Sequence, residues 1–437
     1  MIQLNHTFIK QLFTCLRRSV EIRFMMNRCT KKKLFPIILL CLTLSIFLAS
    51  CYEKKPDTAK DVFVSETTKE DKDDPVETIA PAIPGKEDAD TEVLDEYDRI
   101  VSAMSLREKV GMLFWIRPES LIADKEGKCR SLTSEMKRNY EKYPAGGFVL
   151  FAKNLKDEKT LIDLTSDIHK MNERAFVAID EEGGTISRIA KCDAFDVERF
   201  PDMEEIAMAG DEGEAYRLGI TIGGYLHEYG IDADFAPVAD VNTNPDNPVI
   251  GKRAFGDDPY VAAEMVCNVI DGLHDAGVLS CIKHFPGHGD TVSDTHKEYA
   301  ETLKTWEEIK AVEMIPFEAG IKEGTDMVMV AHISAPNVTG DDTPASLSKM
   351  LITDKLRGEL GFTGVIVTDA LDMQAITDKY GDAKAAREAL LAGADILLMP
   401  KDYYAAFDGI VNCVNDNIIP ESRINESVKR ILMMKKR

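Results

Sequence analysis

The body of this 437-residue chain is poor in cysteine, and its 53 Lys and Arg residues are outnumbered by 75 Asp and Glu. Four of the nine cysteines lie within the first 51 residues. The other five are odd in number and show no CxxC spacing, which argues against a disulfide framework or a zinc cluster. A net charge of −22 argues against a nucleic-acid partner, because binding a polyanion requires clustered Lys and Arg. The hydrophobic fraction of 44% nevertheless supplies enough material for a sizeable core.

The first 51 residues are typical of a secretory signal. Residues 31–33 are all lysine and precede an apolar run over residues 34–47, after which the ending LASC resembles a bacterial lipobox. The run is shorter than the roughly 20 residues that a transmembrane helix needs, so we expect a cleaved signal rather than an uncleaved signal anchor. Cys51 would then be the lipidated first residue, and the tandem Met25 and Met26 indicate that translation starts there. We therefore expect an extracytoplasmic protein, lipid-anchored to the bacterial membrane.

Residues 52–97 are rich in Lys, Asp, Glu, Thr and Pro and contain few large apolar side chains. Such a composition cannot repay the entropy that folding removes. We interpret the segment as a disordered acidic linker that holds the folded part of a lipoprotein clear of the membrane. The folded part is expected to be a single domain over residues 98–437.

Eight short apolar runs rich in β-forming residues recur along this folded part. Amphipathic stretches with helical spacing separate them, as in residues 158–175 and 259–277. Continuous apolar strands that alternate with helices indicate a parallel sheet covered on both faces, and eight units favour a closed TIM-like (β/α)8 barrel, an α/β fold. The runs are VGMLFWI near Val110, GFVLF at Gly147, AFVAID at Ala175, DFAPVAD at Asp234, GVLSCIK at Gly277, DMVMVAH at Asp326, GVIVTDA at Gly364 and ADILLMP at Ala394.

Polar residues stand at or just beyond the ends of five of these runs. In a parallel barrel the carboxyl ends of all strands share one face, so residues far apart in the sequence meet around one pocket. A single Asp at a strand end commonly caps the next helix, and this explanation suits Asp240 best. The residues are Asp180, Asp240, Lys283 with His284, His332 and Asp369.

The loop KHFPGHGDTVSDTH, residues 283–296, places three histidines and two aspartates where Pro and Gly prevent a helix. A metal site would use His284, His288 and His296 with Asp290 and Asp294, but Pro286 and Gly287 disrupt the helical i, i+4 geometry of zinc motifs. A phosphate site is only weakly indicated, because neither GxxxxGK nor GxGxxG is present.

Acid/base chemistry is the third interpretation of the loop. Asp294 and His296 are two residues apart, so the carboxylate can hold one ring nitrogen while the other exchanges a proton. Asp369 offers a nucleophile or an electrostatic stabiliser opposite this pair, as a retaining glycosidase requires. Asp180 could bind sugar hydroxyls together with Arg188 and Lys283.

These residues resemble glycoside hydrolase family 3, specifically its β-N-acetylglucosaminidase branch. The resemblance covers nearly everything from about Met104 onward and rests on motifs that occur in the family's order. They are SLREKVGMLF, GGFVLFAKN, DEEGGTISR, GKRAFGDDP, KHFPGHGDTVSDTH, PFEAGIKEGTDMVMVAH, PASLS and VTDALDMQAI. Two departures are visible: Glu181 stands where the family more often has Gln or His, and Thr295 replaces a commoner Ser.

The resemblance implies a retaining mechanism on a TIM-like barrel, without a metal or cofactor. Asp369 matches the nucleophile position, His296 the general acid/base and Asp294 its partner, whereas His288 is interpreted as structural. The positions that match binding of the terminal sugar and its N-acetyl group are Asp180, Arg188, Arg253, Lys283 and His284.

The sequence thus predicts an exo-β-N-acetylglucosaminidase that acts as a monomer on peptidoglycan fragments or muropeptides. A β-glucosidase-type or β-xylosidase-type relative is disfavoured, because many such relatives take their acid from a second sandwich domain and the expected last barrel helix ends this chain. Two competing hypotheses are a non-catalytic sugar-binding lipoprotein and a metal-dependent hydrolase.

Overall fold

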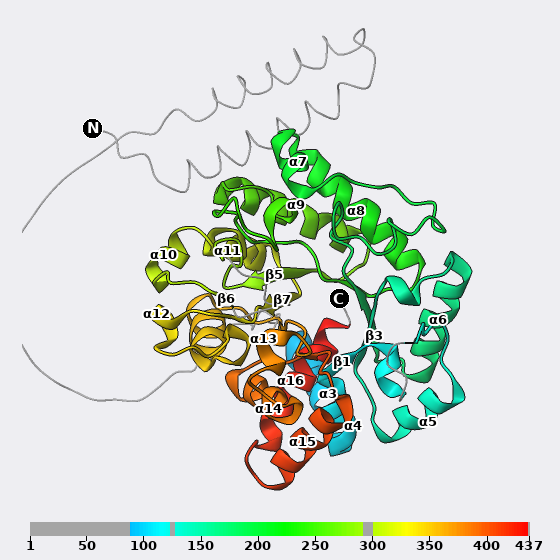
Figure 1. Ribbon diagram of the computed structural model, residues 1–437. Helices are drawn as coiled ribbons and strands as arrows, with labels where there is room; N and C mark the ends of the chain where they lie inside the picture. The colour runs from blue at the N-terminus through cyan, green and yellow to red at the C-terminus, as the bar shows by residue number, and fades with distance from the viewer. Residues whose placement is uncertain (1–87, 123–126, 292–299, 436–437) are drawn as a thin grey trace, which may run out of the picture. The chain divides into compact units, whose positions relative to one another are not determined.

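The computed structural model describes residues 88–122, 127–291 and 300–435, which are drawn in colour in Figure 1. The expected signal and its Cys51 lie outside the described residues, as do Asp294 and His296. Within these ranges, no helix has both the length and the apolar character needed to cross a bilayer.

Each of the eight predicted runs overlaps a β-strand, although β4 shares only Asp234 with its run, so this part of the sequence interpretation is confirmed. Almost every strand residue is buried, which explains why the runs are continuously apolar rather than alternating. The strands are β1 Phe114–Ile116, β2 Gly147–Leu150, β3 Phe176–Ile179, β4 Ala233–Asp234, β5 Cys281–Phe285, β7 Met327–Val330, β9 Val365–Thr368 and β10 Leu397–Leu398. Two further short strands, β6 Ala300–Glu301 and β8 Ile333–Ser334, were not predicted.

The strands form parallel sheets. One sheet has the order β10-β1-β2-β3-β4, a second has the order β5-β7-β9, and β6 pairs with β8. Isolated parallel bridges join Ala233 to Leu279 and Val367 to Ile396, next to the edges of the two larger sheets. The arrangement is a TIM-barrel-like α/β fold, with helices outside the strands (Figure 1).

Helices fill most of the connections between strands. Aspartates in the sequence mark where two of these helices begin. Asp157 caps α6 by accepting from the Thr160 N–H at 2.8 Å, and Asp258 caps α9 by accepting from backbone N–H groups of its first turn. The α-helices are α3 Asp88–Ala103, α4 Leu106–Met112, α5 Ser134–Lys142, α6 Glu158–Met171, α7 Met203–Met208, α8 Glu212–Glu228, α9 Pro259–Asp275, α10 Trp306–Ala311, α11 Met314–Glu323, α12 Pro336–Thr339, α13 Gln374–Thr377, α14 Asp382–Ala392, α15 Tyr403–Asn415 and α16 Glu421–Met434. Short 3-10 turns are η2 Pro118–Leu121, η3 Ala152–Asn154, η4 Gly251–Arg253 and η5 Ala345–Leu347, and η6 Met350–Glu359 is a π-helix.

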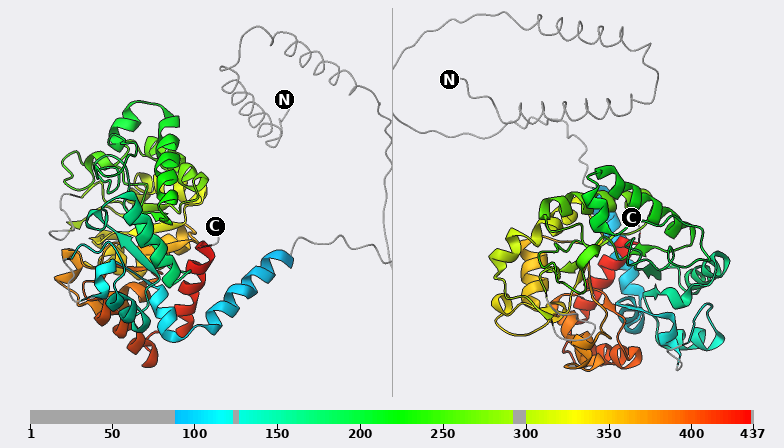
Figure 2. Two further views of the ribbon diagram at one scale, coloured as in Figure 1. Left: turned by 90° about the vertical axis from the view of Figure 1, so that its right-hand side faces the viewer. Right: turned by 45° about the horizontal axis from the view of Figure 1, so that its top comes forward.

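The expected end of the linker at residue 97 is wrong, because residues 88–97 belong to helix α3. The physical reason is the helical spacing of Tyr97, Ile100 and Val101, which lets the C-terminal part of α3 bury apolar side chains. Helix α3 contacts α16 (Figure 2), and Lys429 Nζ of α16 lies 2.5 Å from Asp98 Oδ1.

Aromatic side chains anchor the core at the first three strands of the larger sheet. Trp115 on β1 is fully buried and stacks on Phe176 of β3, with ring centroids 5.0 Å apart. Between them, β2 begins with Gly147, where a Cβ atom would lie 2.6 Å from Cγ of Trp115. Glycine is therefore required here by the close approach of the indole ring.

Candidate active site

A cavity of about 240 Å³ opens beyond the carboxyl ends of β3, β5 and β9. It brings together six of the predicted site residues, namely Asp180, Arg188, Arg253, Lys283, His284 and Asp369. The remaining lining residues are Arg117, Phe151, Glu182, Ile186, Phe235, Val249, His288, Met329, Ala370, Asp372, Met373, Leu398 and Met399. Charged side chains together with Met, Val and Leu side chains give the cavity both polar and apolar walls.

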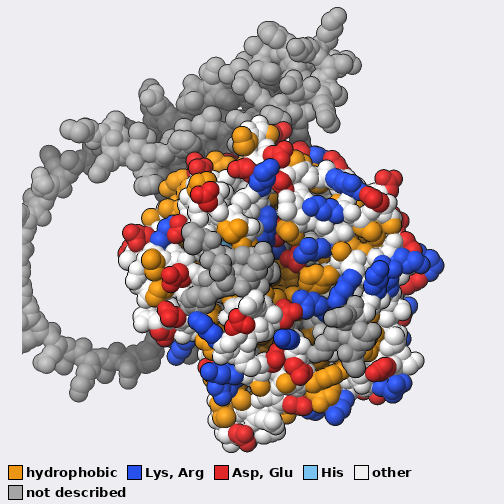
Figure 3. Space-filling model, in the orientation of Figure 1, with side chains coloured by type: hydrophobic (Ala, Val, Ile, Leu, Met, Phe, Trp, Pro, Cys, Tyr) orange, Lys and Arg blue, Asp and Glu red, His pale blue; other side chains and the backbone are white. Residues whose placement is uncertain are grey.

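The outer surface shown in Figure 3 carries charged side chains of both signs, interspersed with apolar ones. The cavity differs from this surface because its charged groups are largely buried and paired with one another. Lys283, for example, is only 2% exposed. Buried charges of this kind persist only when opposite charges and hydrogen bonds surround them.

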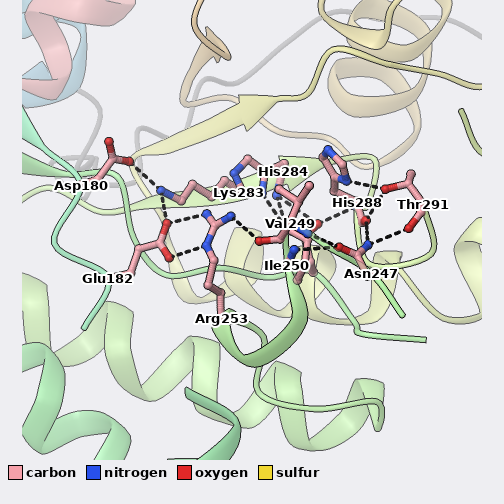
Figure 4. A network of polar contacts seen from close by, with 11 residues as sticks. Asp180, Glu182, Asn247, Val249, Ile250, Arg253, Lys283, His284, His288 and Thr291 are labelled. Carbon is pink, nitrogen blue, oxygen red and sulfur yellow. Dashed lines mark hydrogen bonds and ion pairs between the residues drawn. The ribbon is translucent and has the colours of Figure 1, made fainter. Parts of the chain in front are cut away.

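Lys283 on β5 is the centre of the ionic network in Figure 4. Its Nζ atom lies 2.8 Å from Asp180 Oδ1 and 2.6 Å from Glu182 Oε1. Arg253 binds the same Glu182 carboxylate with two nitrogens, Nη2 at 2.7 Å and Nε at 2.9 Å. Arg188 Nη2 completes the network at 3.4 Å from Asp180 Oδ2. Four predicted site residues thus share one hydrogen-bonded array.

The charges in this network stabilise one another. Burial raises the pKa of the Glu182 carboxyl, but the positive charges of Arg253 and Lys283 outweigh burial and hold the pKa below its ordinary value. Burial lowers the pKa of Lys283, whereas Asp180 and Glu182 raise it, and the net result is a pKa above the ordinary value. At neutral pH Glu182 and Lys283 are therefore both ionised, and the array presents fixed charged groups to a polar ligand.

A second array surrounds Asp240, a fully buried residue that follows β4. Its Oδ2 atom lies 2.7 Å from Nδ1 of His284, and its Oδ1 atom accepts from the backbone N–H of His288 at 2.7 Å. Nδ1 of His288 contacts the Thr291 hydroxyl at 2.6 Å. Asp240 therefore holds the His284 ring and the backbone of the KHFPGH loop rather than capping a helix. His288 lines the cavity although the sequence suggested a structural role.

Asp369 follows β9 and lines the cavity together with residues that follow β3 and β5. Its backbone N–H donates to the Val330 carbonyl at 2.8 Å, and its Oδ1 atom accepts from the Ala370 N–H at 2.7 Å. His332, another polar strand end, does not line the cavity. It is fully buried, with Nε2 2.8 Å from the Ala370 carbonyl and Nδ1 2.7 Å from the Ser346 hydroxyl. His332 thereby fixes the backbone beside Asp369.

The rim of the cavity contains groups that sequence reasoning missed. Arg117, just after β1, lies with Nη1 2.5 Å from Asp372 Oδ2. The guanidinium groups of Arg117 and Arg188 lie 4.9 Å and 5.5 Å from the ring centroid of Phe151. Glu182 was missed as well, although its position two residues after Asp180 in DEEGG was a usable signal.

Glu181, one of the two departures from the family pattern, is buried and points away from the network. Its carboxylate accepts hydrogen bonds from the backbone N–H groups of Arg188, Ile189 and Ala190 and from the Tyr225 hydroxyl at 3.0 Å. Burial raises its pKa, and these hydrogen bonds oppose the rise. Glu181 therefore orders the segment that carries Arg188.

The proposed acid/base pair cannot be placed, because Asp294 and His296 lie outside the described residues. Among residues 88–122, 127–291 and 300–435, no group of three or more His, Cys, Asp or Glu side chains has the arrangement of a metal site. The polar residues that do converge are arranged as ion pairs and hydrogen bonds.

The chain is similar to known proteins over most of its described length. The family model for the glycosyl hydrolase family 3 N terminal domain matches residues 105–434. This chain belongs to glycosyl hydrolase family 3. The family resemblance inferred from the motifs is therefore confirmed.

Individual relatives of this family 3 chain carry related names. A "Beta-hexosaminidase A" of Pseudoalteromonas piscicida is 33% identical over 341 residues, which cover 71% of this chain and 57% of that protein. A "Beta-hexosaminidase" of Xanthomonas oryzae pv. oryzae is 33% identical over 275 residues, covering 61% and 80%. The structure of a family 3 β-N-acetylglucosaminidase from Paenibacillus sp. superposes with a TM-score of 0.72 at 34% identity, covering 76% of this chain and 62% of that one. The chain thus spans less than two thirds of two of these relatives.

Proposed function

We propose that this chain is a retaining exo-β-N-acetylglucosaminidase that releases terminal N-acetylglucosamine from peptidoglycan fragments or muropeptides. The observation that carries the proposal is the position of Asp369 in one small cavity with the array of Asp180, Lys283 and Arg188. The fixed charged groups can hydrogen-bond a polar, uncharged sugar ring, and the Asp369 carboxylate beside them can then act as the nucleophile. The names of the relatives, β-hexosaminidase and β-N-acetylglucosaminidase, support the same sugar class.

In the first chemical step, a carboxylate oxygen of Asp369 would bond to the anomeric carbon while the glycosidic bond breaks. The electron pair of that bond goes to the leaving oxygen, which takes a proton from the His296 imidazolium. In the second step water attacks the anomeric carbon, the bond to Asp369 breaks, and His296 accepts the proton from water. Asp294 would hold the His296 ring in the orientation that both steps need.

The remaining cavity residues would bind the sugar. Lys283, Arg188 and Asp180 offer charged hydrogen-bonding groups for hydroxyls. The apolar side chains of Met329 and Val249, which line the same cavity, suit the methyl group of an N-acetyl substituent. No step of this mechanism uses a metal or a cofactor.

Three further proposals complete the assignment. First, the strands close as a full (β/α)8 barrel, which the isolated bridges from Ala233 to Leu279 and from Val367 to Ile396 support. Second, the protein is lipid-anchored through Cys51 outside the cytoplasm, which the lipobox-like ending LASC supports. Third, it acts as a monomer, so the rate of hydrolysis should be proportional to protein concentration, with constant turnover per molecule.

The decisive experiment measures hydrolysis of an aryl β-N-acetylglucosaminide by the wild-type protein, by Asp369→Ala and by His296→Ala. Loss of turnover is expected for Asp369→Ala and a severe reduction for His296→Ala. Asp378→Ala is the matched control, because this exposed aspartate lies in the same segment, directly after helix α13, and accepts a hydrogen bond from Gln374 of that helix. Full activity of Asp369→Ala would contradict the mechanism.

Two additional readouts distinguish the proposed enzyme from inverting and metal-dependent hydrolases. NMR of the freshly released sugar should show the β-anomer, because two displacements retain configuration, whereas an α-product would exclude the retaining mechanism. Turnover should also be unchanged by EDTA, which would inhibit a metal-dependent hydrolase. A panel of aryl β-glycosides distinguishes a glucosidase-type enzyme, and sugar binding without turnover would indicate a non-catalytic binding protein.

A further inference from the structure

We propose that Asp240 is a positioning residue, which fixes His284 in the tautomer whose Nε2 lone pair accepts a hydrogen bond from a hydroxyl of the bound sugar. The inference rests on the proposed function, because it assumes a sugar in the cavity. It assigns a role to Asp240, which does not line the cavity and would act only through His284.

The contacts of Asp240 define which atom of the histidine carries hydrogen. The carboxylate is fully buried and accepts from the backbone N–H of His284 at 3.2 and 3.3 Å, from the backbone N–H of His288 at 2.7 Å, and from Nδ1 of His284 at 2.7 Å. An ionised carboxylate can only accept, so hydrogen must be on Nδ1. Burial raises the Asp240 pKa, but the hydrogen bonds from the His284 ring and the His288 N–H favour the ionised form, and the net pKa lies below its ordinary value.

The other ring nitrogen of His284 is available to a ligand. His284 lines the cavity, and its Nε2 atom has no hydrogen-bond partner in the described part of the chain. In the tautomer with hydrogen on Nδ1, the ring presents a lone pair at Nε2. The cationic groups of Lys283 and Arg253 can only donate hydrogen bonds. A sugar hydroxyl both donates and accepts, so an acceptor at His284 would take the hydrogen bond that the hydroxyl donates.

Asp240→Asn is the variant that tests this role with little change of shape. The Oδ1 side accepts the short hydrogen bond from the His288 N–H, so the amide oxygen is expected there and the amide NH₂ at the Oδ2 side. The NH₂ group would then donate to Nδ1 of His284, which places hydrogen on Nε2 and turns the acceptor into a donor. We expect KM to rise about tenfold or more with a smaller change in kcat, because the lost contact serves binding.

Two readouts separate positioning from a general structural role. Long-range ¹H–¹⁵N NMR of the imidazoles, with His284 assigned from the His284→Ala spectrum, should show the tautomer change without any substrate. In a double-mutant cycle, Asp240→Asn should reduce kcat/KM in the wild-type background but have little further effect in His284→Ala.

Asp326→Asn is the matched control. Asp326 is also a buried aspartate that holds a histidine, with Oδ2 2.8 Å from Nε2 of His274, and it accepts from the Ser280 N–H at 3.0 Å. It precedes β7 and therefore lies at the strand end opposite the cavity. This variant should lower stability but leave kcat/KM unchanged.

The proposal is overturned if Asp240→Asn keeps the wild-type His284 tautomer or the wild-type KM. It is also overturned if the losses of kcat/KM in the double-mutant cycle are additive, or if Asp326→Asn loses as much kcat/KM as Asp240→Asn. If the wild-type protein shows no turnover, the proposed function fails, whereas the NMR measurement still decides whether Asp240 sets the tautomer.

Discussion

Replacing Glu182 by Gln should strongly destabilise the protein, because it leaves two buried cations short of a partner. The Glu182 carboxylate lies 2.6 Å from Lys283 Nζ and 2.7 Å from Arg253 Nη2. At an effective dielectric constant of about 20, each contact corresponds to about 6 kcal/mol of attraction, most of which offsets the loss of hydration. Glutamine keeps the size of the side chain and removes the charge.

The expected net loss is about 3–5 kcal/mol in the free energy of unfolding, which is the usual range when one partner of a buried ion pair is removed. Asp180 remains 2.8 Å from Lys283 and limits the loss at that residue. Within the described residues, Glu182 is the carboxylate that forms an ion pair with Arg253, so most of the loss arises there. Urea denaturation of the wild-type protein and of Glu182→Gln at pH 7 measures the difference.

The control is Glu426→Gln, which removes a carboxylate of similar type whose side chain is 53% exposed and paired with Arg430. Water screens such a pair, so a loss under about 1 kcal/mol is expected.

The pH dependence of stability gives a second check. The pKa of folded Glu182 lies below its ordinary value of 4.5, so its stabilisation is present above that pH and is lost as pH falls through the folded-state pKa. The difference between wild type and Glu182→Gln should therefore shrink in acid, and equal stability of the two proteins at pH 7 would refute the reasoning.

Two other substitutions test the packing and the backbone of the site. Gly147→Ala should destabilise the protein by about 1–3 kcal/mol, because the new Cβ atom would lie 2.6 Å from Cγ of Trp115. Thermal denaturation measures this, and Gly224→Ala, which meets nothing within 4 Å inside helix α8, should instead be neutral or slightly stabilising. His332→Ala should lower kcat by about tenfold to a hundredfold with less effect on KM, since His332 fixes the backbone next to Asp369. A wild-type kcat in steady-state kinetics would contradict that role.

The strands and much of the site could be predicted because their signals are local. A strand such as residues 147–150 is buried on both faces, so every one of its consecutive residues is apolar or glycine. Asp180 and Asp369 follow such runs directly, so the shared direction of parallel strands was enough to place them at one face. The boundary at residue 97 failed because the acidic composition of the preceding segment concealed the helical spacing of the few apolar residues that follow.

The pairing of charges could not be predicted from the sequence. Glu181 and Glu182 are adjacent and chemically alike, yet one accepts backbone hydrogen bonds behind the site and the other joins Lys283 to Arg253. Which of two neighbouring carboxylates points inward depends on a backbone direction that is set by the packing of β3 and the segment after it. That Asp240 holds His284 instead of capping a helix depends on the same kind of long-range contact.

By itself, the sequence determined the family, the parallel arrangement of eight strands, and the set of polar residues that collect at their ends, because residue order and apolar periodicity are sufficient for each. The tertiary structure alone decided that Glu182 completes the ionic network, that His332 lies behind Asp369 instead of in the cavity, and that Asp240 sets the orientation of His284. Distances between side chains on different strands depend on how the strands and helices pack, and no local pattern encodes them.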